Sequence, residues 1–193
     1  MARHKEFLPE QTLEKAMGLF WKQGYDGSSV EDLVQCTGLG RGSLYGTFGD
    51  KHSLYLAAFD RYQTVGREKL VALQQQEGPL REVLQGFFQQ IIEEMLADTE
   101  RRGCFMVNAA LEMAPHDADV AQRVQSGLSH TEEAFYHVLI KAQAAGELAW
   151  TCDPHRSARF LLNTLLGLRV LGRANPDRRT LEDIVTTALS VFG

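Results

Sequence analysis

Apolar residues recur along this chain at intervals of three and four positions, the spacing of one face of an α-helix. In the first part of the chain this pattern predicts helices over about residues 10–23, 28–38, 41–48 and 50–76. The motif Glu77-Gly78-Pro79 then marks the clearest boundary, because proline is tolerated in the first turn of a helix but not in its interior.

Beyond this boundary the same spacing predicts helices over about residues 80–96, 104–114, 117–145 and 154–172, and a last helix after Asn175-Pro176. No stretch alternates with a period of two residues for long enough to form a strand. We therefore predict an all-α fold with an N-terminal domain over residues 1–66 and a C-terminal domain over residues 67–193.

The start of the second predicted helix carries its own signal. Ser28-Ser29-Val30-Glu31 fits a capping box, in which a serine hydroxyl accepts a hydrogen bond from a free backbone N–H and Glu31 reaches back. This motif predicts a short helix that begins sharply after Gly27.

Composition agrees with a folded globular protein, since 44% of the 193 residues are apolar and 23% are charged. The most apolar stretch, residues 160–170, contains Asn163 and Arg169 and is too short to span a membrane. The first residues lack the apolar run of a secretory signal, so a cytoplasmic location is expected. The three cysteines are widely spaced and match no zinc motif, so the sequence predicts neither a disulfide framework nor a metal site.

The net charge of −5 is unevenly distributed. Residues 1–75 hold nine basic and nine acidic residues, and residues 76–193 hold eleven and sixteen. The first part is therefore not a basic domain of the kind that nucleic-acid binding usually requires. Contacts with phosphate must come from a few well-placed side chains.

The second and third predicted helices form a helix-turn-helix pattern, because both are short and the tight turn Gly38-Leu39-Gly40 joins them. In such a motif the second helix enters the major groove of DNA. Leu44 and Phe48 lie one turn apart and are expected to face inward, which leaves the other face free. The free side chains that can reach phosphates or bases are Arg41, Ser43, Tyr45 and Thr47, with Lys51 at the start of the next helix. The alternative is an ordinary helical corner with Tyr45 half-buried and Arg41 in solvent.

The same region resembles the N-terminal signature of TetR-type transcriptional regulators over about the first 60 residues. The matching segments are Leu13-Glu14-Lys15-Ala16, Leu19-Phe20, Gly24-Tyr25, residues 28–33, residues 38–45, Phe48 and Lys51. The resemblance implies a homodimeric repressor that binds a pseudo-palindromic double-stranded operator, uses no cofactor, and is released by a small-molecule or electrophile effector bound in the C-terminal domain. Carried over by position, it implies DNA contacts from Ser29, Arg41, Gly42, Ser43, Tyr45, Thr47 and Lys51.

Two positions depart from the family pattern. Gly40 stands where relatives have serine or threonine, and Gly46 stands where many have a bulky tyrosine. Because Gly46 has no side chain, base readout is expected to depend on Arg41, Thr47 and the N-terminal arm Arg3-His4-Lys5. The alternative for the arm is a frayed terminus.

The C-terminal domain offers a dimer surface and an effector site. Residues 160–171 are apolar on nearly every side, and Gly167 and Gly172 permit close approach of another helix, so this segment and the last helix are the predicted dimer seam. The alternative is a helix central to its own domain. The predicted effector pocket consists of Phe87, Phe88, Phe105, Asn108, Glu112 and Phe135, although such aromatic residues also form ordinary cores.

Cys104 is the candidate redox sensor. Two arginines precede it in Arg101-Arg102-Gly103-Cys104, and cations at a helix start stabilise a thiolate. The segment also resembles the one that carries a sensing cysteine in electrophile-responsive TetR-type proteins, although it occurs as a structural element in others. Cys36 is expected to be an inert core thiol, and Cys152 to be made less reactive by Asp153.

Two other functional classes compete with DNA binding. An enzyme is disfavoured, because the sequence contains no HExxH, Glu-x-x-His pair, G-x-S-x-G, phosphate-binding loop or dinucleotide fingerprint. A helical protein–protein adaptor would use the C-terminal bundle but leaves the pattern from Arg41 to Lys51 without a role.

Overall fold

The structure, a computed structural model of the chain, describes residues 9–192. This part of the chain forms nine α-helices and a final 3-10 turn, and contains no strand, so the predicted all-α fold is confirmed for it. None of its helices is both long and apolar enough to cross a membrane. The arm Arg3-His4-Lys5 lies outside the described residues.

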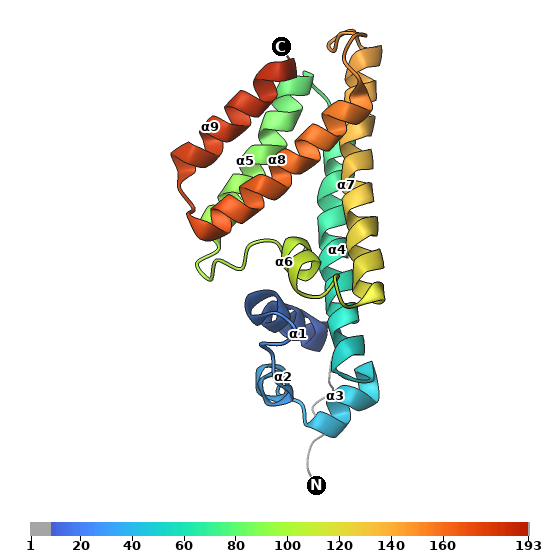
Figure 1. Cartoon of the computed structure of the whole chain (residues 1–193), viewed down its shortest axis with the longest axis vertical. Coiled ribbons are helices and arrows are strands. Elements are labelled where there is room, and N and C mark those ends of the chain that lie inside the picture. Colours follow the sequence, from blue (N-terminus) through green and yellow to red (C-terminus); the bar gives the residue numbers. More distant parts are fainter. Residues whose placement is uncertain (1–8, 193) are drawn as a thin grey trace.

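Four helices build the lower end of the molecule in Figure 1: α1 (Pro9–Gln23), α2 (Val30–Thr37), α3 (Arg41–Phe48) and the start of the long α4 (Lys51–Gln75). We call α1–α3 with this start of α4 the head. Glycines follow the ends of α1 and α2: Gly24 and Gly38 have φ values of 79° and 75°, which place them in the left-handed region.

The capping box of α2 differs from the predicted one. Ser29, not Ser28, is the N-cap: its hydroxyl accepts from the backbone N–H of Asp32, whose carboxylate accepts from the N–H of Ser29. Ser28 is buried and donates to the carbonyl of Gly24 at 2.6 Å. The predicted capping box was therefore wrong by one residue, because Ser28 bonds to the residue that follows α1 and Ser29 caps α2.

The remaining helices form the upper bundle, which we call the body. They are α5 (Leu80–Ala97), α6 (Phe105–Glu112), α7 (Ala118–Ala144), α8 (Pro154–Ala174) and α9 (Arg178–Leu189), followed by the turn Ser190–Phe192. In Figure 1, α4 and α7 run side by side along the molecule, and α6 lies between the head and the rest of the body.

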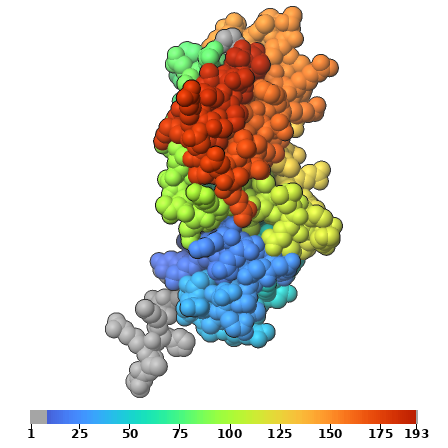
Figure 2. Space-filling view, turned by 60° about the vertical axis from the view of Figure 1, so that its left-hand side comes forward, coloured from blue at the N-terminus to red at the C-terminus, as the bar shows by residue number. Residues whose placement is uncertain are grey.

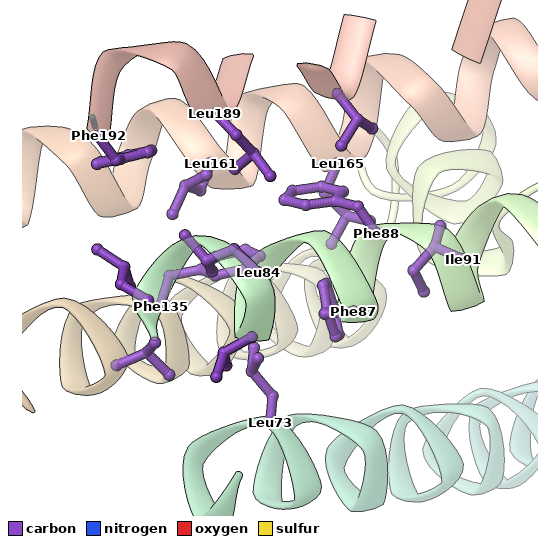
Figure 3. Close-up of a cluster of buried hydrophobic side chains, with 14 of the residues drawn as sticks. Leu73, Leu84, Phe87, Phe88, Ile91, Phe135, Leu161, Leu165, Leu189 and Phe192 are labelled. Carbon is purple, nitrogen blue, oxygen red and sulfur yellow. The ribbon is translucent and has the colours of Figure 1, made fainter. Parts of the chain in front are cut away.

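Two apolar cores stabilise the chain. The body core lies between α5, α7, α8 and α9, and Figure 3 shows Phe88, Phe135 and Leu161 among its side chains. The head core includes Phe20, Leu33 and Leu44, but it also contains Phe105 and Ala109 of α6 and the start of α7. The head is therefore packed onto the body through shared core residues, and the boundary predicted at residues 66 and 67 lies within α4.

Part of α8 leaves apolar side chains in solvent. Phe160, Val170 and Leu171 are 41%, 50% and 42% exposed, although other residues of this helix are fully buried in the body core. Figure 2 shows α8 and α9 side by side on the upper part of one face of the molecule. This helix is thus central to the body and also presents an apolar outer edge.

Candidate DNA-binding surface and central cavity

Helix α3 has one buried side and one open side. Leu44 is fully buried in the head core, and Phe48 is partly buried against it. Arg41, Gly42, Ser43 and Thr47 are exposed, as predicted for side chains that face DNA. Tyr45 is half-buried, and the guanidinium carbon of Arg41 lies 5.8 Å from the centre of its ring.

The side chains next to α3 are held by local contacts. Lys51 lies at the start of α4 with its ammonium 4.2 Å from the centre of the Tyr25 ring, while the carboxylate of Asp50 caps α4 by accepting from the N–H of Ser53. This arrangement presents a cation and free N–H groups at a helix N-terminus, which favours phosphate. Ser29 is exposed, but its hydroxyl and N–H both bond to Asp32.

Gly40 and Gly46 leave open space around the short helix. A Cβ atom built on either glycine meets no atom within 4 Å, and Gly40 gives α3 no side-chain cap. Packing among the described residues therefore does not require glycine at these two positions. The glycines also leave fewer side chains for base readout.

The head contacts the body through a junction between the end of α1 and residues 98–112. The indole N–H of Trp21 donates to the carbonyl of Gly103 at 3.1 Å, and the Arg102 guanidinium lies 4.4 Å from the ring centre. Lys22 forms an ion pair with Glu100 at 2.6 Å. These contacts attach the head directly to the segment that carries Cys104.

A second contact joins the starts of α4 and α7. His52 Nε2 lies 2.6 Å from Asp117 Oδ2, and hydrogen bonding by the N–H of Val120, together with His52, holds the pKa of Asp117 below its usual value. Asp119 is close enough for the three residues to offer metal ligands within 4.8 Å of one another. The His52–Asp117 pair already explains this grouping, so we assign no metal to it.

A cavity of about 100 Å³ lies between α4, α5, α7 and α8, and we call it the central cavity. Its walls are mostly apolar, with Leu70, Phe87 and Ile91 on one side and Leu165 and Leu166 on another. The polar groups and the sulfur atom that reach it belong to Tyr62, Gln63, Arg67, Lys69, Cys104, His130, Thr131 and Arg169.

Three of the six predicted pocket residues, Phe87, Phe88 and Phe135, contact one another, but the six do not line one cavity. Phe87 lines the central cavity, while Phe88 and Phe135 are fully buried in the body core and stack on each other. Phe105 lies in the head core, as an ordinary core residue. The two polar members, Asn108 and Glu112, lie beside a separate surface hollow near Trp21.

Those two polar residues belong to the junction. Asn108 donates to the carbonyl of Arg102 and accepts from Arg173, and Glu112 accepts from the backbone N–H of Asp26 in the head. Asn108 also donates to the carbonyl of Trp21 in α1 at 3.4 Å, so hydrogen bonds from both side chains stabilise the attachment of the head.

Cys104 is buried at the N-cap of α6, and its sulfur accepts a hydrogen bond from the Tyr62 hydroxyl at 3.4 Å. The helix start is as predicted, but the Arg102 guanidinium bonds to Asp98 and stacks on Trp21. Cys36 is only half-buried, and burial raises its pKa, as expected for an inert thiol.

Tyr62, Arg169 and Trp21 were not predicted as site residues from the sequence. An arginine inside the apolar stretch 160–170 was a usable signal, since a cation on the inner side of a helix needs a partner. No local signal pointed to Tyr62 or Trp21, whose spacing is that of ordinary core residues.

Comparison with known proteins matches both parts of the chain. The family model for "Bacterial regulatory proteins, tetR family" covers residues 13–58, and that for "Tetracyclin repressor-like, C-terminal domain" covers residues 79–188. The uncharacterized HTH-type transcriptional regulator YezE of Bacillus subtilis is 32% identical over the whole of both chains. The HTH-type transcriptional repressor ComR of Escherichia coli is 30% identical over 98% of this chain and 91% of its own.

Solved structures agree. The TetR family regulator CifR, a cysteine mutant in complex with a 26-base-pair operator, has a TM-score of 0.87 and 27% identity over 98% of both chains. The reduced form of Escherichia coli NemR has a TM-score of 0.83 over 93% of both chains, and at 20% identity it shows likeness of fold alone.

Proposed function

The chain belongs to the TetR family of DNA-binding transcriptional repressors, and we propose that two copies bind a pseudo-palindromic operator through α3 and release it when an effector acts at the central cavity. The observation that carries this proposal is the division of α3 into a buried side and an open side that continues into the start of α4. The proposal includes no catalytic step.

The residues on the open side of α3 have different roles in this proposal. Arg41 at the helix start can contact a base or a phosphate, Thr47 can contact a base, and Ser43 and Tyr45 can donate to phosphate oxygens. Lys51 acts with the N-terminus of α4 on a phosphate, and Ser29 contributes at the start of α2. The backbone of Gly42 allows close approach. The operator complex of CifR supports this use of the fold.

Dimerisation supplies two heads at the spacing of successive major grooves, about 34 to 36 Å apart. We place the seam on the exposed apolar edge of α8 together with α9. An exposed edge of large apolar side chains costs free energy in a monomer and is covered when two copies associate.

Release follows from the position of α4. This helix starts beside α3, and its Tyr62, Gly66 and Leu70 line the central cavity. An occupant that changes the position of α4 changes the separation of the two heads, provided that it binds the two states with different affinity. Modification of the Cys104 thiol by an electrophile would act on the same wall.

DNA binding is tested by fluorescence anisotropy with the DNA upstream of the gene. Arg41→Ala should cost about 1 to 3 kcal/mol more on the operator than on random DNA if Arg41 reads a base. Lys51→Ala should weaken binding to both and reduce the salt slope by about one. Lys141→Ala, at an exposed position near the end of α7 and outside both the head and the proposed seam, is the matched control for lost charge. If the wild-type chain shows no preference for the upstream DNA, or if the two head variants bind like the control, the assignment of α3 is wrong and a protein–protein adaptor becomes the better interpretation.

Thiol sensing is tested by adding an electrophile such as N-ethylmaleimide to the operator complex. Cys104→Ser should resist release, whereas Cys36→Ser and Cys152→Ser should release as the wild type does. Equal release from Cys104→Ser and the wild type would leave non-covalent binding as the route of induction.

A further inference from the structure

Arg169 places a cation at the wall of the central cavity with few partners of its own. Its side chain is 15% exposed, and the nearest carboxylate, Glu94, lies 3.6 Å from Nη2. That carboxylate is held more closely by Lys69, at 2.5 Å. Within residues 9–192 no hydrogen bond to this guanidinium is found, although it carries five N–H donors. A largely buried charge whose N–H donors have no acceptor costs free energy, unless another group accepts hydrogen bonds from them.

Tyr62 adds a second donor at the same place. Its hydroxyl donates to the Cys104 sulfur at 3.4 Å, and a thiol sulfur is a weak acceptor that a better one can replace. Removal from water raises the pKa of Tyr62 well above its usual value, while the charge of Arg169 opposes that rise. The phenol therefore keeps its proton, and it lies within the field of the Arg169 guanidinium.

Other lining residues provide an apolar surface. Phe87 and Ile91 of α5 and Leu165 and Leu166 of α8 line the cavity, and Arg67 and His130 at its edge are exposed. A ligand that fits this arrangement has a small apolar part and one negatively charged end. A cation is disfavoured, because Arg67, Lys69 and Arg169 outnumber the single carboxylate that two of them share.

We infer that the central cavity binds an amphipathic organic anion, a small monocarboxylate whose oxygens accept hydrogen bonds from Arg169 and Tyr62 beside Cys104. Arginine pairs with carboxylates through two parallel hydrogen bonds, which gives such a site both affinity and orientation. The inference rests on the proposed function, since it names the class of effector for the same cavity.

The site also connects to the head. The ring of Tyr62 packs edge-on against Trp21 of α1 with the centroids 4.9 Å apart, and Trp21 donates to Gly103, next to Cys104. A carboxylate that draws the Tyr62 side chain away from the sulfur would shift its ring against Trp21. The ligand thereby acts on the junction that holds the head.

The test uses benzoate as the probe, with benzamide as its neutral isostere and benzylamine as a cation of similar size. Fluorescence of Trp21 reports binding in the full-length Trp150→Phe protein, where the exposed second tryptophan no longer contributes. Benzoate should bind in the millimolar range or tighter and at least about tenfold more tightly than benzamide or benzylamine.

Variants locate the site. Arg169→Gln should weaken benzoate binding at least about tenfold and leave benzamide unchanged, and Tyr62→Phe should weaken benzoate about threefold to tenfold. Arg159→Gln, on the same helix but paired with Glu132 outside the cavity, should bind benzoate as the parent protein does. Thermal unfolding shows whether each variant is folded. Arg169→Lys, which keeps the charge, should bind benzoate more tightly than Arg169→Gln but less tightly than the parent protein.

The inference is overturned if benzoate does not bind, if benzamide binds equally well, or if Arg169→Gln has no more effect than Arg159→Gln. Failure of the proposed function gives a different result: benzoate binds through Arg169, but operator DNA is not released. If the chain binds operator DNA but does not bind benzoate, the anion site alone is refuted.

Discussion

Replacing Trp21 with phenylalanine tests whether the junction joins the head to the body. The variant keeps an aromatic ring against Tyr62 but loses the hydrogen bond to Gly103 and weakens the stacking of Arg102. The hydrogen bond is worth about 0.5 to 1.5 kcal/mol. The cation–π contact is worth about 0.5 to 1 kcal/mol at a partly exposed site, and phenylalanine keeps part of it.

We therefore expect the free energy of unfolding to fall by about 1 to 2 kcal/mol, because the two losses act at one contact and water replaces part of the hydrogen bond. Urea denaturation followed by circular dichroism measures this change without relying on the removed fluorophore. Trp150→Phe is the matched control: its side chain is 79% exposed, and the change should stay within about 0.5 kcal/mol.

The same variant should also loosen control of the head. If the junction carries the effector signal, the ratio of operator affinities with and without effector should shrink by up to about the factor of 10 that 1.4 kcal/mol represents. A Trp21→Phe protein that is as stable as Trp150→Phe and fully inducible would refute a role for this contact in both folding and signalling.

Two further predictions concern residues near the junction. The pKa of Asp117 is lowered in the folded chain, so its carboxylate contributes its full stabilisation above the unfolded pKa of about 3.9. This contribution is lost as the pH falls through the folded pKa. Asp117→Asn should therefore lose less stability than the wild type between pH 6 and 3 in urea titrations at each pH. Gly103 has a φ of 72°, and a Cβ there would lie 2.8 Å from Cδ of Arg173; Gly103→Ala should thus destabilise the chain by about 1 to 2 kcal/mol in thermal unfolding, and a neutral result would mean that the loop rearranges freely.

The amino-acid sequence by itself determined the helices and the open side of α3, because these depend on local signals. Glycine at a left-handed position ends a helix wherever the chain goes afterwards, as at Gly24 and Gly38, and a proline begins one, as at Pro154. The exposed positions of Arg41 and Thr47 follow from the helical period once Leu44 is buried. The predicted N-cap of α2 was wrong by one residue although the deciding contacts are local: Ser28 bonds to the carbonyl of Gly24, and Ser29 forms the capping box with Asp32.

Which residues share a site depends on how the helices pack and could not be predicted from the sequence. Tyr62, Cys104 and Arg169 come from three separate helical regions, and their spacing in sequence carries no information about their contact. Phe87 and Phe88 are neighbours on α5 and both belong to the body core, yet only Phe87 also lines the central cavity, because one residue of helical rotation turns a side chain by about 100°. The periodic pattern identifies the inner side of each helix, but the packing of α4, α5, α7 and α8 determines where that inner side leaves a cavity.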